Sequence, residues 1–75
     1  MKTANIAIFE RNEEFLNELI SYFNSSHGFS VCATASTGDG ALESLNSVSP
    51  DVAVIDTALK GIDGIKLLDH IKNHI

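Results

Sequence analysis

The sequence predicts an α/β fold in which three strand–helix units build a parallel sheet. Three short apolar blocks, at residues 6–9, 29–33 and 52–55, have the length of buried strands. A helix pattern follows each block, and only short polar connections separate the elements. Strand–helix alternation at this spacing indicates parallel strands joined by right-handed crossovers.

The first unit combines a continuous apolar block at residues 6–9 with a helix that Asn12 is expected to cap. Glu13 and Glu14 then lie in the first turn, where the helix dipole favours anions. The helix ends within residues 24–28. One apolar stripe of period near 3.6 marks the face expected to pack on the sheet: Phe15, Leu16, Leu19, Ile20 and Phe23.

The second unit starts with a partly alternating strand at 29–33, in which Cys32 is expected to be a small buried hydrophobe. Thr37 or Asp39 can cap the helix that follows, and Pro50 marks its exit. Its apolar face is expected at Ala41, Leu42, Leu45 and Val48.

The third unit starts with the β-branched block at 52–55, and its helix is expected to begin at a cap on Asp63. The apolar stripe of this helix is predicted at Ile65, Leu68, Ile71 and Ile75, with Leu67 on its flank. Across the three units, all four phenylalanines are expected in the core: Phe9, Phe15, Phe23 and Phe29.

Composition limits the classes of function. Seventy-five residues suffice for one domain at most, and 44% hydrophobic with 20% charged residues is typical of a folded soluble protein. The net charge of −5, with no cluster of lysines and arginines, argues against nucleic-acid binding by this segment. No apolar run approaches the length of a membrane span, and no signal peptide is evident, so we expect a cytoplasmic protein that does not enter a membrane.

Two carboxylates end neighbouring strands if the strand order is 2-1-3. Glu10 follows the first strand and Asp56 the third, so both are expected at the carboxyl rim of the sheet, where ligands of open parallel sheets bind. A lone aspartate at this place commonly caps a turn. Two neighbouring carboxylates also suit a hard cation such as Mg²⁺, and a carboxylate can accept a phosphoryl group.

Four segments resemble the receiver domains of response regulators. Residues 51–56 with Gly64 eight positions later are similar to the phosphoacceptor strand, and residues 6–15, 37–42 and 61–64 to other parts of that family. The sporulation-type receivers are the most similar. The resemblance implies a flavodoxin-like, doubly wound parallel sheet that lacks its last two strands. Residues 1–75 would then be the N-terminal three-fifths of a receiver domain.

The resemblance also implies roles for individual residues. Asp56 matches the aspartate that takes a phosphoryl group from a histidine kinase or phosphotransfer protein. Glu10, Asp56 and the backbone carbonyl of Ala58 match ligands of Mg²⁺, and Gly64 matches a turn glycine. Such a domain is a phosphoryl acceptor rather than an enzyme, and in the sporulation type a separate transcription-factor domain binds DNA.

Two departures from the family pattern weaken the expected chemistry. Arg11 stands where the family has a second metal-binding acid, which changes the local charge by two units and should weaken Mg²⁺ binding. Arg11 could instead pair with Asp56, and Lys60, in place of a proline, could offer a second positive partner. The family's lysine on the fifth strand lies beyond this sequence. We therefore expect phosphorylation of this segment to be weak or absent.

Two other functions remain open. Arg11 and Lys60 also suit a degenerate interaction module that keeps the fold without the chemistry. Gly38 and Gly40 form a Gly-x-Gly before a helix, as in nucleotide- or flavin-binding domains, but Glu43 occupies the third glycine position. The apolar third strand would be an exposed edge, so we expect either further chain or a partner to cover it, and a homodimer that pairs this strand with its copy would do so.

Overall fold

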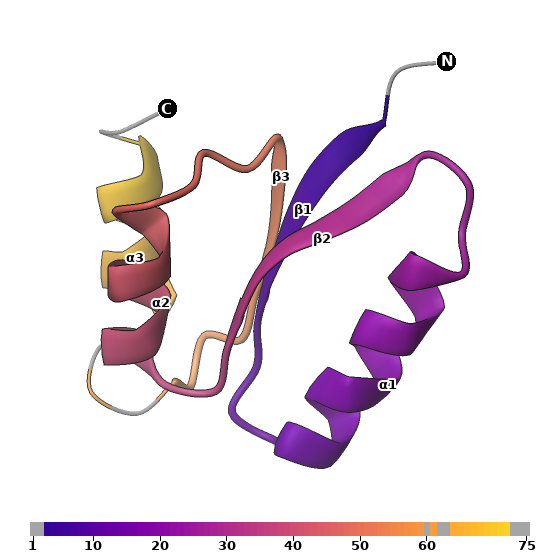
Figure 1. The fold of residues 1–75 in the computed structure, drawn as a ribbon. Helices are drawn as coiled ribbons and strands as arrows, with labels where there is room; N and C mark the ends of the chain where they lie inside the picture. The colour runs from indigo at the N-terminus through magenta and orange to yellow at the C-terminus, as the bar shows by residue number, and fades with distance from the viewer. Residues whose placement is uncertain (1–2, 60, 62–63, 73–75) are drawn as a thin grey trace.

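A computed structural model describes residues 3–59, 61 and 64–72 (Figure 1). Strands and helices alternate along the chain, as the sequence predicts. The elements are β1 (Ala4–Phe9), α1 (Glu13–Asn24), β2 (Phe29–Ala35), α2 (Gly38–Leu45), β3 (Val52–Ile55) and α3 (Gly64–Lys72).

The three strands form one parallel sheet in the order β2-β1-β3. The predicted strand order is therefore confirmed, with β1 in the centre. β1 starts two residues before its predicted block, and β2 ends two residues after its own. In both strands the paired backbone continues past the most apolar residues. In the β1–β2 pair the register shifts between Ile6 and Ala7, so Cys32 is an extra residue in β2.

The central strand is apolar on both sides because both faces of the sheet are covered. Ile6 and Ile8 pack with Leu16 of α1 on one face. Ala7 and Phe9 point to the other face, where α2 and α3 lie (Figure 1). Alternation along β1 thus divides the core into two layers, as the period of a strand requires.

Side-chain caps begin the first two helices. Asn12 is the N-cap of α1, and its Oδ1 accepts a hydrogen bond from the backbone N–H of Phe15 at 3.0 Å. Thr37, rather than Asp39, caps α2, with its Oγ1 accepting from the N–H of Gly40 at 3.1 Å. A Cβ on Gly40 would crowd the Thr37 hydroxyl and the Ala35 side chain, which gives this glycine a packing role. The Asp63 cap predicted for α3 lies outside the described residues.

The predicted apolar face of α3 is wrong. Leu67, expected on the flank, is fully buried in the core with Phe9 and Ala41, whereas Ile65 and Leu68 are exposed. α3 lies next to α2 on the same side of the sheet (Figure 1), and Leu67 is the apolar side chain that it buries among its described residues. The side chains of Ile71 and Ile75 lie outside the described set.

Two of the four phenylalanines are also not in the core. Phe9 is buried and Phe23 packs against the α1 layer. Phe15 is exposed, because its neighbour Leu16 takes the position that faces the sheet. Phe29 is exposed at the start of edge strand β2, where its ring contacts Phe23 edge to face with centroids 5.3 Å apart. Among the helices described, none is long and apolar enough to cross a membrane.

Candidate functional site

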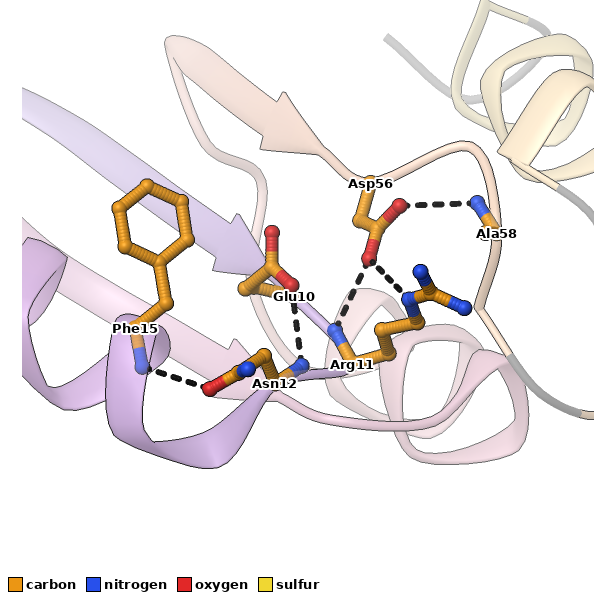
Figure 2. A network of polar contacts seen from close by, with 6 residues as sticks. All are labelled: Glu10, Arg11, Asn12, Phe15, Asp56 and Ala58. Atoms are coloured by element: carbon orange, nitrogen blue, oxygen red, sulfur yellow. Dashed lines mark hydrogen bonds and ion pairs between the residues drawn. The ribbon is translucent and has the colours of Figure 1, made fainter.

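The carboxyl ends of the three strands are tied together by backbone hydrogen bonds. The N–H of Asp56, directly after β3, donates to the carbonyl of Phe9 at 2.8 Å. The N–H of Glu10, directly after β1, donates to the carbonyl of Ala35 at 3.0 Å. Because these bonds continue the sheet past its last paired residues, Glu10 and Asp56 start from one rigid rim (Figure 2).

Two backbone N–H donors and one guanidinium nitrogen meet the Asp56 carboxylate. Oδ1 accepts from the backbone N–H of Ala58 at 2.9 Å, and Oδ2 accepts from the backbone N–H of Arg11 at 3.3 Å. The guanidinium Nε of Arg11 lies 3.6 Å from the same Oδ2 (Figure 2). The Asp56 side chain is 16% exposed and the Arg11 side chain 62% exposed, so the carboxylate is sheltered beneath a largely solvated cation.

These donors set the charge state of Asp56. The backbone N–H of Ala58 contributes most to holding the pKa of the carboxyl below its ordinary value, and partial burial opposes it. The backbone N–H of Arg11, the Glu10 side chain and the charge of Arg11 lower the pKa further. Asp56 is therefore a carboxylate at neutral pH, which is the form that acts as a nucleophile or ligand.

Glu10 is held by its own turn. Its Oε2 accepts from the backbone N–H of Asn12 at 2.9 Å, and Asn12 in turn caps α1 (Figure 2). The short link from β1 to α1 is thus organised by the side chains at positions 10 and 12. One consequence is that a Glu10 oxygen is already used within the loop.

The arrangement is a poor fit to Mg²⁺. This cation prefers near-octahedral oxygen ligands, usually one or two carboxylates with waters. Here both Asp56 oxygens accept N–H donors, Oδ2 also faces a guanidinium, and one Glu10 oxygen is hydrogen-bonded. No cluster of three or more histidine, cysteine or acidic residues with metal-binding geometry occurs among the residues that the structure describes.

The remaining predicted site residues are placed only in part. Ala58 is exposed after β3, and the contact that the structure shows is made by its N–H, on Asp56. Gly64 is the first residue of α3. Lys60, the second proposed cation, lies outside the described residues. Gly38 and Gly40 form the first turn of α2, as the Thr37 cap requires.

The sequence did not predict the backbone N–H of Arg11 as a ligand of Asp56. No residue type signals such a contact, because every residue except proline can donate in this way. The contact of Ala58 had a signal, since aspartate commonly accepts from the N–H two residues ahead.

Comparison with known proteins gives one consistent family. The family model of the response regulator receiver domain matches residues 6–75. The chain is 38% identical over 68 residues to "Regulator of RpoS" from Escherichia coli, covering 91% of this chain and 20% of that protein. It is 32% identical over 65 residues to a protein-glutamate methylesterase/protein-glutamine glutaminase from Natronomonas pharaonis, covering 87% and 18%. The chain thus spans about a fifth of the length of these relatives.

Solved structures show the same fold. The signal receiver domain of NarL from Mycobacterium tuberculosis superposes with a TM-score of 0.89 at 22% identity, covering 99% of this chain and 60% of that one. RcsB from Salmonella typhimurium, in a structure concerned with its DNA interaction, gives a TM-score of 0.86 at 20% identity, covering 100% and 39%. The likeness supports the arrangement of three βα units.

Proposed function

This chain belongs to the response regulator receiver domain family, and from that premise we propose that it accepts a phosphoryl group on Asp56 in a two-component signalling pathway. The observation that carries the proposal is Asp56 itself. It is an ionised, sheltered carboxylate on the rim of a parallel sheet, directly after β3. In this role the domain is a signalling acceptor, with a histidine kinase or a phosphotransfer protein as donor.

We expect the reaction to be slow and Mg²⁺ to bind weakly. Phosphoryl transfer depends on positive charge placed against the transferring group. Glu10, Asp56 and Ala58 would supply the metal ligands, but Arg11 occupies the place of an acid and contacts Asp56. Lys60 remains a second candidate cation, and Gly64 a candidate turn residue.

The test is incubation with acetyl phosphate followed by intact-mass measurement. A slow and partial gain of one phosphoryl group, lost in Asp56→Asn, is the expected result. Asp51→Asn is the matched control, because Asp51 lies at the other end of β3 and its Oδ2 accepts from the N–H of Asn5. A phosphoryl group that persists in Asp56→Asn would refute the assignment.

A second candidate is an interaction module that works without phosphorylation. The Arg11–Asp56 ion pair favours it, because the acceptor already has a positive partner. In that case Asp56→Asn would leave partner binding unchanged and acetyl phosphate would add no mass. The gain of mass on incubation with acetyl phosphate therefore distinguishes the two candidates.

We also propose that residues 1–75 are the first three-fifths of a receiver that controls a transcription factor, of the sporulation type. The support is the sequence resemblance, together with the coverage of 60% of the NarL receiver. Reading the frame beyond Ile75 tests this, because a strand ending in serine or threonine and another ending in lysine should follow. DNA contact would then belong to the output domain, and the setting would be the cytoplasm.

We also propose that residues 1–75 on their own form a homodimer through β3; in a longer receiver a following strand would cover this edge instead. β3 is an edge with Val52 exposed, whereas the opposite edge, β2, carries an extra residue at Cys32 that disturbs regular pairing. Light scattering across a dilution series should show a dimer. A well-folded monomer at all concentrations would remove this part of the proposal.

A further inference from the structure

Two hydrogen-bond donors and one cation face the Asp56 carboxylate. The N–H of Ala58 and the N–H of Arg11 donate to its two oxygens, and the Nε of Arg11 forms an ion pair with Oδ2. Glu10 is the other carboxylate of this rim, and its Oε2 accepts from the N–H of Asn12. A site for a divalent cation needs the opposite, an excess of oxygen ligands with free lone pairs. A group of converging N–H donors with one guanidinium is the pattern that binds oxyanions.

We propose that Arg11 takes the place of the divalent cation, so that this receiver accepts a phosphoryl group without metal and holds the product through the Arg11 guanidinium. This inference rests on the proposed function of Asp56. It adds that the positive charge that neutralises the site comes from an arginine of the chain itself rather than from a metal ion. The expected ligand of Arg11 is a phosphoryl oxyanion rather than only the resting carboxylate.

The geometry distinguishes the two oxygens of Asp56. Each accepts one backbone hydrogen bond, Oδ2 from Arg11 and Oδ1 from Ala58, but only Oδ2 also has the Arg11 guanidinium as an ion-pair partner, at 3.6 Å. Oδ1 is therefore the less neutralised oxygen and is the attacking atom. Its bond to phosphorus forms as the bond from phosphorus to the acyl oxygen of an acyl phosphate breaks, and that oxygen leaves with the electron pair as a carboxylate. No proton or electron is left over.

The Arg11 side chain can move with the negative charge as it shifts from the carboxylate to the phosphoryl group. The side chain is 62% exposed, and of its guanidinium only Nε is drawn to Asp56 (Figure 2). When the carboxylate becomes an acyl phosphate, negative charge grows on the phosphoryl oxygens outside the rim. A planar guanidinium on a solvated side chain can turn its outer nitrogens to those oxygens while its backbone N–H stays on Oδ2.

The first test compares labelling by acetyl phosphate with excess EDTA and with excess Mg²⁺, measured by intact mass over time. The wild-type chain should label at the same rate in both. Arg11→Ala should label at least about tenfold more slowly, since a charged donor to the transferring group is lost. Arg11→Lys should recover part of the rate, and Arg11→Asp should label only with Mg²⁺. Wild-type labelling that requires Mg²⁺ would overturn the inference and leave the proposed function intact.

The second test needs no phosphoryl transfer. Mn²⁺, as a paramagnetic probe of the Mg²⁺ site, should leave the amide signals of Ala58 and Arg11 unaffected in the wild-type chain and broaden those of Ala58 and residue 11 in Arg11→Asp. Lys72→Asp makes the same change of charge at the far end of α3 and should resemble the wild type. Selective broadening at Ala58 in the wild type would overturn the inference. If no variant is labelled, the proposed function fails, and the Mn²⁺ comparison still decides which charge the site accepts.

Discussion

Two adjacent leucines of α3 give the sharpest test of how this helix packs. Leu67 is 0% exposed and Leu68 is 46% exposed, although the sequence pattern favours Leu68 as the core residue. We expect Leu67→Ala to destabilise the domain far more than Leu68→Ala. The two variants remove the same atoms from neighbouring positions of one helix, so helix propensity cancels.

The magnitudes follow from burial. Replacing a fully buried leucine with alanine costs about 2–5 kcal/mol, because transfer free energy is lost and a cavity remains. Full burial of a leucine side chain stabilises by about 1.5–3 kcal/mol, so the half-buried Leu68 should cost about 1 kcal/mol. A domain of this size has a free energy of unfolding of about 4–11 kcal/mol, so Leu67→Ala should remove a large part of it.

Urea unfolding followed by far-ultraviolet circular dichroism measures both variants. The midpoint should fall strongly for Leu67→Ala and slightly for Leu68→Ala, with similar slopes if both unfold in one step. Ile65→Ala, at another exposed position of α3, should behave like Leu68→Ala. Equal losses for Leu67→Ala and Leu68→Ala would mean that α3 turns a different face to the core.

Three further predictions concern the caps, the acceptor and the turns. Asn12→Ala should cost about 1 kcal/mol in urea unfolding because α1 loses its cap, whereas Asn17→Ala, at an exposed position of the same helix, should be neutral or slightly stabilising. Asp56 has a lowered pKa, so its carboxylate stabilises the fold above about pH 4 and this contribution is lost as the pH falls through the folded-state pKa. The melting temperature of Asp56→Asn should therefore be below that of the wild type at neutral pH, and the two should converge in acid. A difference in melting temperature that does not change with pH would contradict this. Gly61→Ala should cost about 1–2 kcal/mol for its positive φ of 94°, and Gly28→Ala should cost about the same for its φ of 95°, because the exposed Asp39 side chain near Gly61 can move aside; an unchanged urea midpoint in either variant would contradict this.

The alternation of strands and helices and the caps of α1 and α2 were accessible from the sequence because they depend on local residue types, whereas the strand order came with the family resemblance. Continuous β-branched blocks indicate a covered parallel sheet, and the polar residue before each helix indicates its start. It was harder to predict which side of a helix faces the core where the helix has more apolar residues than the core can accommodate. In α3 the pattern includes Ile65, Leu67 and Leu68, and of these the structure buries only Leu67. Apolar spacing indicates which residues could be buried, and the way the helix packs on its neighbours decides which of them are.

At the site, the sequence could predict residue types but not the atoms that meet. The reversal of charge at position 11 is visible in the sequence, and the ion pair to Asp56 is its structural counterpart. The backbone N–H of Arg11 donates to the same oxygen, Oδ2, and no side-chain pattern in the sequence predicts this contact. This division makes Arg11 a well-defined place to test the chemistry. Every replacement except proline keeps the N–H that helps to position Asp56, so the variants change the charge beside the acceptor while this support of the acceptor remains.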